Sequence, residues 1–405
     1  MTHPAPAQKP SLRFVALMAF LFSTIAISID MMLASLPEIG TALSPAAPEN
    51  AQLVVSVFFL GLALGTVLAG PICDAIGRRP LILWGLGLYA VGAVMCWMAP
   101  TIELMIAGRV LQGLGASAPR VGGMAVIRDR FEGRAMAATL SIVMMIFTLV
   151  PGVAPVLGAW VAEWLGWRAV FAVFAVFAGI GALWFYLQQP ETLAPEDRSA
   201  LNLRTWVTQM AETLRHPHTR AALLTQLCIF GGLYSFLTAA PLVYEESLNA
   251  GTLFPYILGA VSLIGGISSF INARIVERLG MTPIVRIALM TWCAFAAIAL
   301  VALLATSAGS AAQLVIVSLN MFGSFLSLGF VIGNTNAIAL QPMGHIAGTA
   351  AATVTSIATL GAGLITVPIA MSFNGTAVPL LVGILLCAIG SVWFSLKLPR
   401  VTQIS

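Results

Sequence analysis

Two ionisable side chains, Asp30 and Arg109, fall inside long apolar stretches of the sequence. A charge is costly inside a hydrocarbon layer, so such a group is expected to have a partner and a function. A carboxyl group in this setting can take up and release a proton, and a guanidinium group can pair with its ionised form. An ion pair between Asp30 and Arg109 would lower the cost of burying both charges.

Membrane-spanning helices would have to position these two groups. The chain has 405 residues, of which 59% are hydrophobic and 8% are charged, whereas a soluble domain carries about 25% charged residues. Apolar stretches of roughly 20 residues can each cross about 30 Å of hydrocarbon. We expect twelve, at residues 14–36, 52–72, 81–99, 102–126, 136–161, 168–188, 221–244, 252–273, 284–305, 311–338, 347–372 and 376–396. The composition thus predicts an all-α membrane protein.

The charges of the loops predict the orientation of these spans. Of the 19 Lys and Arg residues, all but Arg109, Arg120 and Arg168 lie at a terminus or in alternate loops, and the opposite loops are mainly acidic. The positive-inside rule therefore places both termini in the cytoplasm. Lys9 and Arg13 precede an apolar run without a cleavage site, so the first span is expected to remain in the protein.

The expected helix directions bring Asp30 and Arg109 to a similar depth. Asp30 precedes the outer end of the first span by about two turns, and Arg109 follows the outer start of the fourth by about two turns. Two interpretations remain. The pair could couple protonation of Asp30 to the opening of a cavity, or it could be a static bridge between two helices. Because the last six spans contain no buried acid, coupling is favoured.

A polar segment at residues 189–220 divides the spans into two groups of six. We expect an N-terminal six-helix bundle over residues 1–188 and a C-terminal bundle over residues 221–405. Repeated halves around a central site are common in secondary transporters.

One part of the polar segment, residues 201–214, has an apolar face. Its members are Leu203, Trp206, Val207, Met210 and Leu214. This pattern fits an amphipathic helix on the inner leaflet or a solvated linker with some helicity.

The second span ends in a charged turn. Gly61, Gly65 and Ala69 flatten one face of that span for close helix packing. The turn then carries Gly70, Asp74, Gly77, Arg78 and Arg79. The whole pattern, G-x(3)-G-x(4)-G-P-x(2)-D-x(2)-G-R-R-P, resembles the loop between helices 2 and 3 of the major facilitator superfamily of transporters. A weaker echo, containing Asn272 and Arg274, follows the eighth span.

This resemblance implies roles for several charged residues. Arg109-x-x-Gln112-Gly113 resembles the fourth-helix signature of the superfamily, whose arginine takes part in proton coupling in many antiporters. Asp74, Arg78 and Arg128 would form a latch between the halves that breaks when the transporter opens inward. Solvated loop charges are the alternative for these three.

Three further stretches resemble particular groups of exporters within the superfamily. Pro151, Gly152, Pro155 and Gly158 in the fifth span resemble the fifth-helix signature of antiporters, although Ala159 stands where a second glycine is common. These residues should kink or loosen the helix. Residues 341–351 and the pair Asp30-Met31 resemble the Bcr/CflA (bicyclomycin and chloramphenicol resistance) drug:proton antiporters.

The resemblance implies a twelve-helix exporter with two pseudo-symmetric bundles in a bacterial inner membrane. It would act as a monomer and exchange protons for hydrophobic or amphipathic drugs or metabolites. No nucleotide-binding loop is present, so the proton gradient would supply the energy and no cofactor or metal is expected. The alternative is a carrier for one native solute, such as a sugar or organic acid. Neither an enzyme nor a nucleic-acid-binding protein is expected.

Soft apolar, aromatic and amide side chains would line the substrate cavity. The candidates are Met31, Met32, Gln112, Met144, Met145, Phe147, Gln226, Tyr234, Asn320, Asn334 and Asn336. Arg120 lies eleven residues after Arg109, about three helical turns. It could steer a substrate, or its side chain could extend to the membrane surface. His345 is expected to have a structural or latch role.

Overall fold

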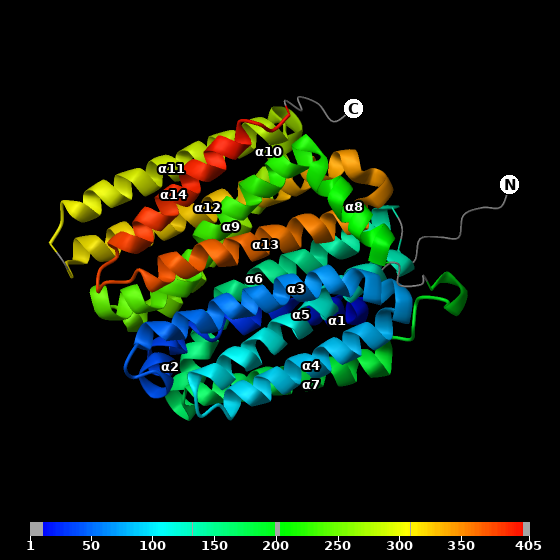
Figure 1. The fold of residues 1–405 in the computed structure, drawn as a ribbon, viewed down its shortest axis with the longest axis horizontal. Helices are drawn as coiled ribbons and strands as arrows, with labels where there is room; N and C mark the ends of the chain where they lie inside the picture. Colours follow the sequence, from blue (N-terminus) through cyan, green and yellow to red (C-terminus); the bar gives the residue numbers. More distant parts are fainter. Residues whose placement is uncertain (1–10, 132, 199–202, 308, 400–405) are drawn as a thin grey trace.

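A computed structural model describes residues 11–131, 133–198, 203–307 and 309–399 of the chain. These residues form a bundle of long helices (Figure 1). The long helices are α1 (Leu12–Asp30), α3 (Ala51–Ile76), α4 (Arg78–Trp97), α5 (Ile102–Arg130), α6 (Gly133–Leu165), α7 (Trp167–Gln188), α9 (Pro217–Leu242), α10 (Phe254–Leu279), α11 (Met281–Leu304), α12 (Ala311–Leu340), α13 (Ala347–Met371) and α14 (Val378–Ser395).

Short elements connect the long helices. Two are α-helices, α2 (Leu36–Leu43) and α8 (Leu203–Arg215), which lie at opposite ends of the bundle (Figure 1). The 3-10 segments are η1 (Leu33–Ser35), η2 (Pro48–Asn50), η3 (Pro195–Asp197), η5 (Gly251–Leu253) and η6 (Gln341–Ile346), and η4 (Val243–Ser247) is a π-helical turn.

The predicted all-α membrane fold is confirmed. Among the described residues, ten stretches are long and apolar enough to cross a membrane, and one of them, Ala311–Met371, contains both α12 and α13. The remaining long helix, α5, has a lower hydropathy because it carries Arg109 and Arg120 among its glycines. Its 29 residues are nevertheless long enough to span the hydrocarbon.

Small residues let neighbouring helices pack closely, as the spacing predicts. A Cβ atom on Gly61 of α3 would overlap the Val110 carbonyl oxygen of α5, and one on Gly113 of α5 would overlap the Phe58 carbonyl oxygen of α3. Between the first six and last six long helices, a Cβ on Gly259 of α10 would lie 2.6 Å from the Gly152 carbonyl oxygen of α6. Close backbone approach at these positions requires glycine.

The first span differs from its prediction. Hydropathy suggested a continuous helix over residues 14–36, but α1 ends at Asp30 and the chain turns at Met31 and Met32 before η1 and α2. Pro37 explains the interruption. In a continuous helix its ring would clash with the carbonyl group of Leu33, whereas it is tolerated in the first turn of α2.

The apolar segment of the polar linker forms α8, which packs against α9 and α13. Thr213 on this helix is completely buried, and Trp206 and Met210 are half-buried. Residues 199–202, which include the predicted start of this helix, and the Leu203 side chain lie outside the described part of the chain.

Candidate functional site

The Asp30 carboxylate lies at the point where α1 ends. Only 6% of the surface of this residue is exposed. Ser28, two residues earlier, lies 2.5 Å from the Tyr89 hydroxyl on α4, and the following carbonyl group, of Met31, abuts Gly158 of α6. Within the described residues, no hydrogen bond or ion pair reaches the Asp30 carboxylate. This end of α1 is held by its neighbours, but its carboxylate is not.

Arg109 is completely buried in the first six helices. Its Nε donates to the Val54 carbonyl oxygen at 3.1 Å, and its Nη1 donates to Gln112 Oε1 at 3.0 Å. The guanidinium carbon lies 4.4 Å from the centre of the Phe58 ring. Nη2 finds no hydrogen-bond partner among the described residues. Arg109 is thus fixed on two sides and has one unused donor group.

The predicted Asp30–Arg109 ion pair is not formed in this structure. The ion pairs of the described residues join Arg78 to Asp74 and Asp129, and His345 to Glu212. The prediction rested on equal depth, but depth leaves the rotation of each helix about its axis undetermined. Arg109 faces α3, and no carboxylate lies within ion-pair distance of it in the described part of the chain.

Tyr89 and Cys96 of α4 extend the polar surroundings of Arg109. Both interact electrostatically with its guanidinium group. The Cys96 thiol lies 3.8 Å from Gln112 Oε1, and the Tyr89 hydroxyl reaches Ser28 on α1. Tyr89 therefore stands between the end of α1 and Arg109, a link that hydropathy and spacing did not indicate.

The charged turn between α3 and α4 is the centre of a second cluster. Arg78 is 7% exposed at its side chain, donates from Nε to Asp129 at 2.9 Å and from Nη1 to Asp74 at 3.3 Å. The backbone amides of Arg78 and Arg79 donate to Glu191, at 3.0 and 3.1 Å. Glu191, just after α7, thus caps the start of α4, and sequence reasoning missed it.

Gly77 lets Glu191 reach this position. Its φ of +105° and ψ of +165° are essentially restricted to glycine, and a Cβ atom there would overlap Glu191 Oε2. Gly280, at the corresponding turn between α10 and α11, also has a positive φ of +78°. The two turns share this backbone feature, in keeping with the sequence echo.

The other expected latch residues occupy different surroundings. The space around Gly70 is open. The Arg128 guanidinium group lies 4.0 Å from the place of a Cβ atom on Gly348, near the start of α13. Asn272 accepts a hydrogen bond from Asn334 at 2.8 Å, and Arg274 lies over the Phe270 ring. The Arg78 side chain bonds within the first group of helices, to Asp74, Asp129 and the Cys73 carbonyl oxygen. Arg128, in contrast, approaches the second group at Gly348.

The expected cavity residues have several environments. Met31, Met32, Gln112, Asn320 and Asn334 are buried, whereas Met144 and Met145 are exposed. Phe147 is half-buried.

The amide side chains differ in their bonding. Asn334 is bonded to Asn272, and Gln226 donates to Thr335 and Asn336, so these amides join α12 to α10 and α9. Both polar side-chain atoms of Asn320 lack a partner among the described residues.

Tyr234 connects the two groups of helices. Its ring stacks on Phe59 of α3 with 3.6 Å between ring centres, and on Phe230 of α9 with 5.7 Å. Its hydroxyl is hydrogen-bonded to Thr359 on α13 and interacts with Arg120 on α5. Tyr234 was predicted as a cavity residue, but its partners Phe59 and Thr359 were not foreseen.

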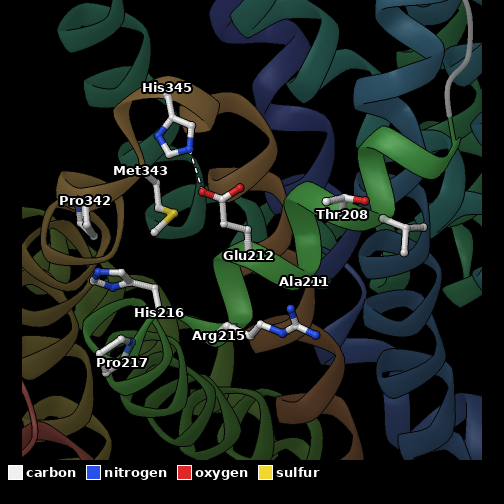
Figure 2. A pocket seen from close by; sticks show the side chains of 10 residues that line it. Thr208, Ala211, Glu212, Arg215, His216, Pro217, Pro342, Met343 and His345 are labelled. Atoms are coloured by element: carbon white, nitrogen blue, oxygen red, sulfur yellow. Dashed lines mark hydrogen bonds and ion pairs between the residues drawn. The ribbon is translucent and has the colours of Figure 1, made fainter.

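A groove of about 660 Å³ lies beside α8 at the end of the bundle. Figure 2 shows Glu212 of α8 pointing across it toward His345 of η6. Their side-chain atoms are 2.8 Å apart, and both residues are exposed. Gln209 of α8 also accepts from Thr349 at 2.8 Å. The linker helix is therefore attached to the start of α13 by polar contacts.

Comparisons with known proteins agree with this architecture. The Major Facilitator Superfamily matches residues 16–366 of the chain. The uncharacterized MFS-type transporter YdgK of Bacillus subtilis is 31% identical over 398 residues, covering 95% of this chain and 96% of its own length. The bicyclomycin resistance protein homolog of Haemophilus influenzae is 29% identical over 285 residues, covering 70% of this chain and 71% of its own. The multidrug resistance protein MdtL of Escherichia fergusonii is 31% identical over 57% of this chain and 63% of its own.

Solved structures support the fold. The D-xylose-proton symporter superposes with a TM-score of 0.75 at 14% identity, covering 96% of this chain and 99% of the symporter. The human organic anion transporter MFSD10 (TETRAN) gives 0.70 at 17% identity, covering 96% and 98%. The family match covers most of the chain, and its helices have the arrangement of these transporters. The chain therefore belongs to the Major Facilitator Superfamily.

Proposed function

We propose that the chain is a proton-coupled exporter of hydrophobic or amphipathic drugs. It would lie in a bacterial inner membrane as a monomer with both termini in the cytoplasm, and it would work by alternating access. The names of two relatives, a bicyclomycin resistance protein homolog and a multidrug resistance protein, support export of drugs. The distribution of Lys and Arg supports the orientation.

The observation that carries the proposal is the Asp30 carboxylate, buried at the end of α1 with no partner among the described residues. An isolated carboxylate is strongly disfavoured away from water unless it is neutral, paired or hydrated. Protonation of Asp30 would therefore depend on whether the surrounding helices admit water. Alternating access changes that condition, which is what coupling to a proton gradient requires.

Arg109 would supply the second half of the coupling. Its Nη2 is an unused, buried donor in the described part of the chain, and a buried donor without a partner costs about 1–3 kcal/mol. A small movement of α1 relative to α5 could bring Nη2 of Arg109 within hydrogen-bond distance of the ionised Asp30 carboxylate. Tyr89, which contacts Ser28 and interacts with Arg109, lies on the path of such a movement. The deprotonated and protonated states would then favour different helix arrangements.

The charged cluster around Arg78 would stabilise one of those arrangements. Arg78, Asp74 and Asp129 are joined by ion pairs, and Arg128 lies close to Gly348 on α13. In this proposal the cluster holds the ends of α3, α4 and α5 in register, and Arg128 provides the contact that opens and closes.

Vesicles that contain the purified protein and have an acidic interior test this function. Adding a panel of amphipathic drugs outside should release protons from the interior in exchange for drug, with a rate that saturates with drug concentration. Protein-free vesicles control for drugs that carry protons themselves. If no drug triggers proton movement, a dedicated carrier of one native solute becomes the better account.

A further inference from the structure

Arg120 differs from Arg109 although both lie on α5. Arg109 is buried, whereas Arg120 keeps an exposed side chain. Arg120 precedes the end of α5 at Arg130 by ten residues, about 15 Å along the helix axis. A guanidinium group at that depth is costly if it faces lipid, so such groups usually face the bundle interior or water. Arg120 acts electrostatically on Tyr234 of α9, and the Tyr234 ring stacks on Phe59 of α3, so Arg120 lies near the boundary between the two groups of helices.

No acid neutralises Arg120 in the described residues. The ion pairs there involve other residues, and Tyr234, the ionisable side chain that acts on Arg120, is neutral at pH 7. An exposed guanidinium group offers five donors in a planar fork that suits a carboxylate. Arg120 therefore has free donor capacity for a ligand.

The groups beside Arg120 are suited to a flat ring. Tyr234 is nearly parallel to Phe59 and to Phe230, with interplanar angles of 9° and 4°. Phe59 belongs to α3 and Tyr234 to α9, so the stack crosses between the two groups of helices. When the two groups of helices move apart, the face of the Tyr234 ring that Phe59 covers becomes available. An aromatic ligand could take the place of Phe59 by offset stacking.

We propose that Arg120 and Tyr234 form a binding site for an aromatic carboxylate, with Arg120 holding the carboxylate and Tyr234 stacking on the ring. This site deepens the proposed function, since it rests on a drug-exporting transporter and names one class of its substrates. Thr359 fixes the Tyr234 hydroxyl from α13. The site thus joins α5 of the first group to α9 and α13 of the second, as a substrate that drives alternating access requires.

Three ligands with one ring and different charge test the site: naphthalene-2-carboxylate, naphthalene-2-carboxamide and naphthalen-2-ylmethylammonium. Equilibrium binding is measured by competition against radiolabelled naphthalene-2-carboxylate, with the protein in lipid nanodiscs and no proton gradient. We expect the carboxylate to bind at least about tenfold more tightly than the amide, because hydrogen bonds to charged groups are the stronger ones. The ammonium compound should bind more weakly than either.

Variants separate charge from packing. Arg120→Gln should bring the carboxylate and the amide to within about threefold of each other, and Arg120→Lys should keep part of the preference. Tyr234→Phe should weaken both ligands by a similar, smaller factor. Arg130→Gln, an exposed cation at the end of the same helix, is the matched control and should behave as wild type. Elution and melting profiles verify that each variant is folded.

The proposal is overturned if the wild type binds the amide as well as the carboxylate, if none of the three ligands binds, or if Arg120→Gln keeps the preference. Because the assay uses no gradient, its result is separate from that of the proton-release experiment. If drug export is coupled to protons but the carboxylate is not preferred, only the proposed binding site is rejected. If the carboxylate is preferred but no protons move, the binding site stands and the proposed proton coupling is rejected.

Discussion

In the described part of the chain, Asp30 forms no ion pair and Nη2 of Arg109 has no hydrogen-bond partner, although both residues are buried in the same group of helices. Most buried polar groups in proteins are hydrogen-bonded, so each exception needs an explanation. A static bridge between α1 and α5 would have joined the two, and no such bridge is formed. Two unsatisfied groups at the end of α1 and on α5 are what a conformational change could bring together. This arrangement favours coupling over a purely structural role.

Gly77 provides a residue-scale prediction about the α3–α4 turn. Replacing it with alanine places a Cβ atom in a backbone region reserved for glycine, at a cost of about 1–3 kcal/mol, and pushes it against Glu191. We expect Gly77→Ala to lower the melting temperature of the purified protein.

Gly70→Ala is the control for this change, because the space around Gly70 is open. Alanine is favoured over glycine inside a helix, so this variant should melt at or slightly above the wild-type temperature. Equal melting of the two variants would contradict the cap formed by Glu191.

At the scale of elements, α6 and α10 make a close backbone contact between the two groups of helices. Gly152 and Gly259 meet backbone to backbone. Gly259→Val should therefore force the helices apart and slow drug export by about tenfold or more, since overpacking costs about 1–3 kcal/mol. Transport into inverted vesicles measures the effect.

Gly179→Val on α7 is the matched control. Gly179 has open space around it, so its variant should transport at a rate near that of wild type. If both valine variants were equally impaired, general damage to the membrane helices would explain the loss, and the α6–α10 contact would not.

The attachment of α8 to η6 should depend on the contact between Glu212 and His345. Trypsin cleavage after Arg204, an exposed residue of α8, reports release of the helix. We expect Glu212→Ala to be cleaved faster than wild type, by less than about fivefold because exposed pairs contribute little.

Glu196→Ala, at another exposed acid of the linker, is the matched control and should be cleaved at the wild-type rate. Equal cleavage of Glu212→Ala and wild type would contradict a role of this contact in holding α8.

Local sequence predicted some elements well and others poorly. Close packing on one face of α3 followed from Gly61 and Gly65, because spacing on one helix determines which face is flat, but the sequence did not predict that α5 is the partner. Glu191 could not be predicted as the partner of Arg78, since 113 residues separate them along the chain. The missing Asp30–Arg109 pair has a related cause: hydropathy places a residue at a depth but leaves the rotation of its helix open.

At the scale of the whole molecule, the two groups of helices touch at the end where α2 lies. Contacts join η1, α2 and η2 to α9, α10 and α13. The twelve long helices of the described residues followed from composition and hydropathy. The relative placement of the two groups did not, because it depends on contacts such as Phe59 with Tyr234 that lie far apart in sequence.

The proposed orientation makes the α2 end face the outside of the cell. A membrane-impermeant maleimide added to intact cells should label a cysteine introduced by Glu163→Cys, in the last turn of α6, and should leave Arg204→Cys unlabelled until the cells are opened. Both positions are exposed in the structure. The wild type controls for its five native cysteines. The reverse pattern of labelling would invert the orientation.

The most direct test of the account measures drug-triggered proton release from vesicles that contain wild-type protein, Asp30→Asn or the control Glu163→Gln, at an exposed acid in the last turn of α6. The account predicts that Asp30→Asn abolishes proton release while drug binding and drug-for-drug exchange continue, and that Glu163→Gln behaves as wild type. Proton release that persists in Asp30→Asn would contradict the central claim that Asp30 is the coupling acid.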